Sequence, residues 1–185
     1  MKSTINQLIH DSIAVKSSLP IDDIYTVAMV LIDTLKKGHK LVVAGNGGSA
    51  ADAQHVTAEF TGRFMRDRAP LPAIALTSNS SSITAIGNDY GFDQVFSRQL
   101  AALAQPNDVF IGISTSGQSE NLIQAFEYAN THSIPTISLT GHDGGRLQSL
   151  ATYAVNVPSP VTARIQEAHI LILHIWCQLV EEALF

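Results

Sequence analysis

The chain has 185 residues, of which 45% are hydrophobic and 15% are charged, so it is long enough and apolar enough to fold as one domain around a core. The formal net charge is -5 without a block of like charges, which excludes the basic surface typical of nucleic-acid binding. The single cysteine, Cys177, excludes an internal disulfide and fits a reducing compartment.

The hydrophobic pattern predicts helices that alternate with strands. Residues 1–38 are expected to form two helices, because apolar residues in the second recur at helical spacing up to Gly38. Five short apolar runs are predicted strands: 41–44, 72–76, 109–113, 136–139 and 154–157. Helices are predicted over 50–66, 93–104, 119–131 and 161–184, and a loop or helix cap over 78–82. This alternation predicts an α/β domain with helices on both faces of a parallel sheet.

No segment is predicted to enter a membrane or to direct export. The N-terminus shows neither the apolar region nor the cleavage site of a signal peptide. The most apolar run, 170–180, is shorter than the roughly 20 residues that span a bilayer. We therefore expect a cytoplasmic protein without membrane or nucleic-acid partners.

Two polar turns follow predicted strands directly. Residues 45–50 read Gly-Asn-Gly-Gly-Ser-Ala, residues 114–119 read Ser-Thr-Ser-Gly-Gln-Ser, and a helix is predicted after each. Free N–H groups at helix starts bind anions, although either turn alone fits ordinary loop chemistry equally well. The two turns together favour a phosphate ligand. Neither matches a dinucleotide or Walker motif, which disfavours a dehydrogenase or an ATPase.

Candidate proton-transfer and metal-binding groups lie on two predicted helices. His55 and Glu59 are four residues apart, so they share a helix face and suit zinc binding or proton transfer, but such pairs are more often solvated. The last helix carries Gln166, Glu167, His169 and His174. His174 lies in an apolar stretch, where a histidine is usually a core residue. The residues by themselves leave these alternatives open.

Six motifs occur in order at fitting distances: AGNGGSAADAQH, AEFTGRF, GNDYGF, GISTSGQS, LTGHDGG and ARIQEAHILILH. Together they resemble the phosphoheptose isomerases, members of the sugar isomerase (SIS) domain superfamily. The resemblance runs from about residue 40 to the C-terminus. It implies a flavodoxin-like, three-layer, doubly wound parallel sheet of five strands. The SIS domain would cover residues 39–185, and helices over residues 1–38 would pack on the core and take part in oligomerisation.

The resemblance also implies a reaction and an assembly. The reaction is the aldose–ketose isomerisation of sedoheptulose 7-phosphate to D-glycero-D-manno-heptose 7-phosphate through an enediol, the first step of ADP- or GDP-heptose synthesis. The assembly is a homotetramer with active sites between subunits and one zinc ion per subunit.

Carried onto this sequence, the resemblance implies Glu59 and His174 as the catalytic acid–base pair. The implied zinc ligands are His55, Glu59, Gln166 and His174. The implied substrate-binding positions, with Ser49 and Arg63 beside them, are Asn46, Gly47, Gly48, Glu59, Asn88, Asp89, Ser114, Thr115, Ser116, Ser119 and Gln166. Some family members carry Asp just before the Arg of RIQE, where this chain has Ala163, which puts a polar role at that position in doubt.

Three other functions remain as alternatives. Non-catalytic relatives of the same fold bind the bacterial replication initiator and lack the residues matched by Glu59 and His174. This chain keeps both, which favours the enzyme. An isomerase of another phosphosugar is the second alternative. A sugar-phosphate sensor is the third, and it is disfavoured because residues 1–38 lack a basic helix-turn-helix pattern.

Overall fold

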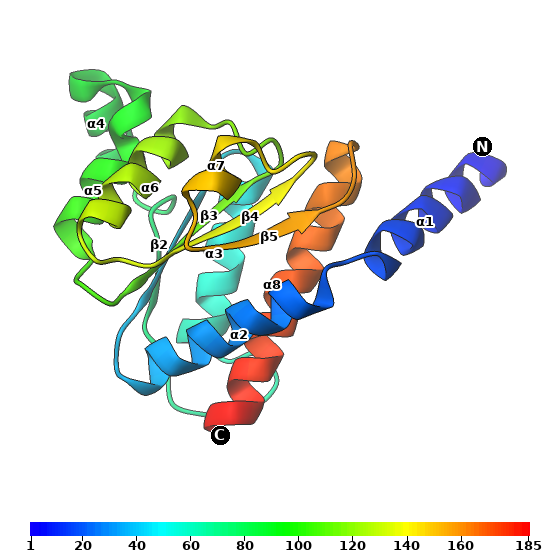
Figure 1. Ribbon diagram of the computed structural model, residues 1–185, viewed down its shortest axis with the longest axis horizontal. Helices are drawn as coiled ribbons and strands as arrows, with labels where there is room; N and C mark the ends of the chain where they lie inside the picture. Colours follow the sequence, from blue (N-terminus) through cyan, green and yellow to red (C-terminus); the bar gives the residue numbers. More distant parts are fainter.

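Five strands form one sheet through the middle of the molecule, seen in Figure 1, a computed structural model that describes residues 1–185. They are β1 (Leu41–Gly45), β2 (Ala73–Ala75), β3 (Val109–Ser114), β4 (Thr136–Gly141) and β5 (Tyr153–Val157). All pair in parallel, in the order β2-β1-β3-β4-β5. This is the order of flavodoxin-like sheets, so the predicted fold class is confirmed.

The helices cover both faces of the sheet. They are α1 (Lys2–Ser17), α2 (Ile21–Lys36), α3 (Gly48–Thr61), α4 (Ser80–Tyr90), α5 (Val95–Leu103), α6 (Glu120–Thr131), α7 (Gly145–Leu150) and α8 (Thr162–Leu184), with a short 3-10 helix over Phe92–Gln94. Helices α2, α3 and α8 share one hydrophobic cluster with the sheet, and α5, α6 and α7 share the other. The result is a three-layer α/β sandwich.

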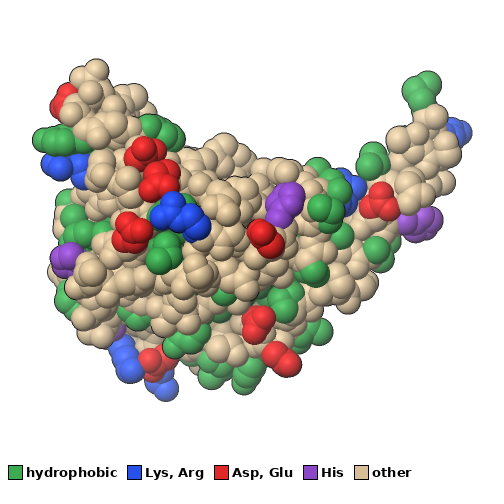
Figure 2. All heavy atoms as spheres, turned by 45° about the horizontal axis from the view of Figure 1, so that its top comes forward, with side chains coloured by type: hydrophobic (Ala, Val, Ile, Leu, Met, Phe, Trp, Pro, Cys, Tyr) green, Lys and Arg blue, Asp and Glu red, His purple; other side chains and the backbone are tan.

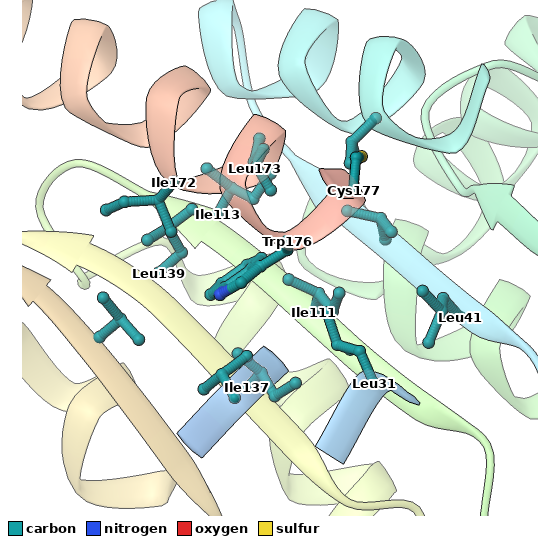
Figure 3. Close-up of a cluster of buried hydrophobic side chains, with 14 of the residues drawn as sticks. Leu31, Leu41, Ile111, Ile113, Ile137, Leu139, Ile172, Leu173, Trp176 and Cys177 are labelled. Atoms are coloured by element: carbon teal, nitrogen blue, oxygen red, sulfur yellow. The ribbon is translucent and has the colours of Figure 1, made fainter. Parts of the chain in front are cut away.

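Alternate residues of each strand divide between the two clusters. Leu41 and Val43 face α2, α3 and α8, whereas Val42, between them, faces the opposite layer. Figure 3 shows Trp176 of α8 above the sheet, among the side chains of the first cluster. Its indole N–H donates to the carbonyl of Ile24 in α2 at 3.0 Å. One buried side chain therefore joins two helices and the sheet.

The structure corrects the expected helices in three places. A complete helix, α4, occupies 80–90, where no helix was predicted beyond the loop or helix cap over 78–82. Asn79 caps α4, accepting from the N–H of Ser82. Helix α7 was not predicted at all. The helix predicted over 50–66 ends at Thr61 in α3, because the N–H groups of Phe64, Met65 and Arg66 donate to the Glu181 carboxylate instead of to a helical turn.

Helix α1 projects from the body of the molecule like an arm (Figures 1 and 2). None of its residues is buried, although Ile5, Leu8, Ile9 and Ile13 are hydrophobic. The nearest helix is α8, where Arg164 donates to the carbonyl of Leu8 at 2.8 Å. None of the helices has the length and apolarity needed to cross a bilayer.

Candidate active site

Both polar turns lie at one edge of the sheet, where β1 and β3 end. The two strands are neighbours, with Gly45 paired to Ile113. Along the chain, β1 continues to β2 on one side of it, and β3 continues to β4 on the other. The connections therefore diverge between β1 and β3, and in open α/β sheets ligands bind outside the carboxyl ends of the strands at such a switch point.

The first turn, residues 45–50, is shaped by glycines. Gly47 has a φ of 57°, a left-handed conformation that favours glycine. A Cβ on Gly48 would lie 2.6 Å from the side-chain nitrogen of Gln166, so α8 places Gln166 directly against the start of α3. Ser49 is buried behind the turn. The N-terminus of α3 is thus open to an anion with Gln166 beside it.

The second turn, residues 114–119, is held by its own hydroxyl groups. Ser114 Oγ accepts from the N–H of Gly117 at 3.1 Å and lies 3.2 Å from Ser119 Oγ. Ser116 Oγ accepts from the N–H of Gln118 at 3.3 Å. Thr115 is partly exposed and Ser116 is exposed. The turn is therefore ordered before any ligand binds, with hydroxyl groups at its surface.

A pair of amides joins the two turns. The side chains of Asn46 and Asn121 exchange two hydrogen bonds, each of 3.0 Å. Asn121 lies in the first turn of α6 and is buried. Sequence reasoning missed this residue; its position two residues after Ser119, where a helix start faces the ligand edge, was the available signal. The pair fixes the two turns relative to one another.

The candidate acid–base residues meet farther along the same two helices. Helices α3 and α8 run side by side in the same direction, since Gln166 reaches Gly48 and His174 reaches His55. The Nε2 atoms of His55 and His174 are 2.9 Å apart, and Glu59 Oε1 is 3.6 Å from His55 Nε2. The two rings share this contact as a hydrogen bond when one facing nitrogen donates and the other accepts.

The ends of this cluster are apolar. The ring of Phe64 lies 5.4 Å from the ring of His174. Cys177, one turn beyond His174, is buried, and burial, together with the negative charges of Glu59 and Glu181, raises the pKa of its thiol to about 12. The sulfur is therefore a thiol at neutral pH and behaves as a small hydrophobic side chain. Glu59 itself is accessible, with 22% of its side chain exposed.

Some predicted site residues stay apart from this cluster within one chain. Asn88 and Asp89 lie exposed on α4 and are hydrogen-bonded to each other at 2.8 Å. Arg63 is exposed and makes no side-chain hydrogen bond or ion pair. Gln166 and His174 are separated by eight residues of continuous helix, about 12 Å. The chain thus joins His55, Glu59 and His174 at one place and the two turns with Gln166 at another.

The donor atoms at the cluster are of the kinds that bind zinc. Zinc takes imidazole nitrogen and carboxylate oxygen, and two nitrogens bonded to one tetrahedral zinc are about 3.3 Å apart, close to the spacing of the two histidines. The chain nonetheless contains no ready-made set of three or more His, Cys, Asp or Glu side chains arranged as a metal site. The residues fit a zinc ion by type, and small side-chain adjustments would be needed to surround it.

Comparisons with known proteins identify the family of the chain. The family model of the SIS domain matches residues 8–141. The phosphoheptose isomerase of Aneurinibacillus thermoaerophilus is 50% identical over 190 aligned positions, covering 100% of this chain and 96% of that protein. That of Nitratiruptor sp. is 55% identical over 160 positions, covering 86% of each.

The chain belongs to the phosphoheptose isomerase family. The solved structure of the phosphoheptose isomerase of Neisseria gonorrhoeae has a TM-score of 0.92 and 41% identity to it, covering 98% of both chains. The fold is therefore shared with this family from end to end, including the N-terminal helices that precede the sheet.

Proposed function

We propose that this chain is the isomerase that converts sedoheptulose 7-phosphate to D-glycero-D-manno-heptose 7-phosphate, as its family membership suggests. The observation that carries the proposal is the convergence of His55, Glu59 and His174 on one pair of helices. Helix α3 begins at a glycine turn that suits an anion, and Gln166 of α8 lies against that turn. One ligand with a phosphate at one end and a carbonyl at the other suits this arrangement.

The two turns would bind the phosphate. Neither turn contains Lys or Arg, so hydroxyl groups, backbone N–H groups and the N-termini of α3 and α6 would carry the binding. The amide pair of Asn46 and Asn121 holds both turns in place. Anchoring the phosphate fixes the rest of the sugar and so lowers the entropic cost of reaching the reactive geometry.

Glu59 and His174 would move the protons. One of them takes the proton from the carbon beside the carbonyl, so that the C–H electrons form the double bond of the enediol. The other exchanges the proton between the two oxygens, and protonation of the adjacent carbon completes the isomerisation. His55 contacts both residues and orients them.

Zinc is part of the proposal. His55, Glu59 and His174 would hold it, and it would supply Lewis-acid polarisation of the substrate carbonyl. Gln166, the fourth predicted ligand, lies with the two turns, so its place in the zinc site stays a prediction. Metal analysis of the purified protein should find about one zinc per chain, and a chelator should remove both the metal and the activity. Full turnover by a protein shown to be free of metal would reject this role.

Substitution of the acid–base pair tests the reaction. Glu59→Gln and His174→Gln should each abolish turnover of sedoheptulose 7-phosphate, because each replaces a proton carrier by an amide that does not titrate. Glu182→Gln, an exposed carboxylate on the same helix α8, is the matched control and should remain active. Normal activity of either acid–base variant would end the assignment. Ribose 5-phosphate and fructose 6-phosphate serve as control substrates, and preference for one of them would point to another phosphosugar.

The proposed assembly is the homotetramer. Helix α1 exposes about half or more of Ile5, Leu8, Ile9 and Ile13, a hydrophobic stripe that a second copy would cover. A neighbouring subunit would also be the source of residues that complete the site, such as Asn88 and Asp89. Light scattering should give about 79 kDa for four chains of 19.8 kDa, and a smaller species for Ile9→Glu. A fully active wild-type monomer would contradict this assembly. A cytoplasmic location and the heptose pathway downstream stay predictions.

A further inference from the structure

A buried ion pair lies just beyond the candidate active site and has no part in the proposed chemistry. Arg68 Nε donates to Glu181 Oε1 at 2.9 Å, and only 1% and 2% of their side chains are exposed. A buried ion pair is weak as a source of stability, because the desolvation of both charges offsets their attraction. The pair is therefore better explained by the segments of the chain that it holds together.

The pair binds the end of α3 and the loop behind it to α8. The Glu181 carboxylate accepts from the N–H groups of Phe64, Met65 and Arg66 at 2.9, 2.9 and 3.0 Å. The Arg68 guanidinium donates to the carbonyls of Glu59 at 2.8 Å and Phe60 at 2.9 Å. These carbonyls belong to the last turn of α3, which has no helical partners for them. The side chains of Arg68 and Glu181 make eight hydrogen bonds in all, including the one between them, and these hold the end of α3 where the next helical turn is missing.

The hydrogen-bond network of Arg68 and Glu181 contacts residues of the candidate site. The Glu59 carbonyl is an acceptor of Arg68, so the backbone of Glu59 is held directly. Glu181 lies seven residues after His174 in α8, two turns along the same face. Phe64, whose N–H is bound by Glu181, places its ring 5.4 Å from the ring of His174.

We propose that Arg68 and Glu181 are positioning residues of the isomerase, which set the spacing between Glu59 and His174. The proposal rests on the roles given to those two residues under the proposed function. Neither Arg68 nor Glu181 touches the reacting atoms. Their loss should lower kcat, because the proton carriers move apart, and should leave KM nearly unchanged, because the phosphate turns lie at the opposite end of α3.

The test uses Glu181→Gln and the milder Arg68→Lys in the full-length, metal-loaded protein. Displacement of a catalytic group by about 1 Å can cost on the order of 100-fold, so we expect kcat to fall roughly 10- to 100-fold, with KM within about twofold of wild type. Circular dichroism at the assay temperature confirms that each variant is folded. Unchanged kcat in both folded variants would overturn the proposal.

Asp108→Asn is the matched control. Asp108 is an equally buried carboxylate, with 2% of its side chain exposed, and it pairs with Lys40 and accepts from the N–H groups of Lys40 and Gln105. It lies at the starts of β1 and β3, at the opposite edge of the sheet from the site. The control should lose stability comparably yet keep its kcat. An equal fall in kcat here would show that the effect of the Arg68 and Glu181 variants is only structural.

A second measurement separates this proposal from the proposed function. The ring-proton NMR signals of His174 should shift in Glu181→Gln, because Phe64 moves relative to the imidazole, and should stay in place in Asp108→Asn. If the wild type fails to turn over sedoheptulose 7-phosphate, the proposed function is wrong. The NMR shift then still tests whether the Arg68–Glu181 pair positions His174. His174 signals that do not move in Glu181→Gln would reject the positioning role itself.

Discussion

At the scale of single residues, the two turns depend on a few side chains that use their hydrogen bonds on one another. Asn46 and Asn121 satisfy each other's amides, and Ser114 supports the backbone of Gly117. A ligand would therefore meet donors that are already fixed, which reduces the ordering cost of binding. The cost of removing one partner is correspondingly high, since the other is left unpaired.

Asn121→Leu should weaken phosphate binding. The substitution keeps the approximate size of the side chain but removes both hydrogen bonds to Asn46, which then no longer holds the two turns together. We expect KM for sedoheptulose 7-phosphate to rise roughly tenfold, the equivalent of about 1.4 kcal/mol, with a smaller change in kcat. Steady-state kinetics and inhibition by inorganic phosphate measure this. A raised KM with unaltered phosphate inhibition would place the effect elsewhere.

At the scale of elements, the fold depends on how closely helices approach the sheet. A Cβ on Gly112 in β3 would lie 2.4 Å from the ring of Phe126 in α6, closer than packed atoms can come. Gly87 in α4 is different, since its nearest neighbour would be Val95 at 3.9 Å. The same change from glycine to alanine therefore has opposite consequences in the two elements.

Gly112→Ala should destabilise the protein by about 1 to 3 kcal/mol, because the added methyl group forces α6 away from β3. Gly87→Ala should stabilise it by about 0.5 to 1 kcal/mol, because alanine favours the helix and meets open space. Urea unfolding of the two variants measures both changes. A stabilising Gly112→Ala would mean that α6 packs more loosely than the structure shows.

Much of the fold can be predicted from the sequence, because short apolar runs identify the buried strands. The five strands and the two turns were predicted in this way, whereas the flavodoxin-like sheet was expected only from the resemblance to the SIS domain superfamily. Helix α4 was not predicted because none of its residues is buried, so its sequence shows no clear hydrophobic periodicity. The C-terminal end of α3 was predicted wrongly because the N–H of Phe64 donates to Glu181, which lies 117 residues later in the sequence. Arg68 was not predicted for the same reason, since long-range hydrogen bonds leave no local pattern, and Asn121 had only its position at a helix start as a signal.

At the scale of the whole molecule, the buried ionisable groups set how stability depends on pH. His169 is fully buried, donating from Nε2 to the Thr140 carbonyl, while Nδ1 has no partner. Burial lowers the pKa of His169 to about 4, against the opposing effect of that hydrogen bond. Burial alone would raise the pKa of Glu181, but its hydrogen bonds from Met65, Phe64, Arg66 and Arg68 outweigh it and lower the pKa to about 2.

Both His169 and Glu181 make the folded protein less stable at low pH. Between about pH 6.5 and pH 4 the unfolded chain binds a proton on His169 that the folded protein excludes, so the free energy of unfolding falls as the pH falls. We expect a loss of about 2 kcal/mol between pH 7 and pH 5 from this residue. Glu181 acts in a lower window, between its ordinary pKa and about 2. Urea unfolding at both pH values should show a smaller loss in His169→Asn, and an identical loss would contradict this assignment.

Cys177 also has a practical consequence. Its sulfur lies between the helices that carry the proposed chemistry, and at a pKa of about 12 it offers almost no thiolate to a reagent. A thiol reagent therefore reacts with Cys177 only after α8 separates from its neighbours and water reaches the sulfur. The labelling rate of this one atom then reports how often the two helices part, without any probe having to be introduced.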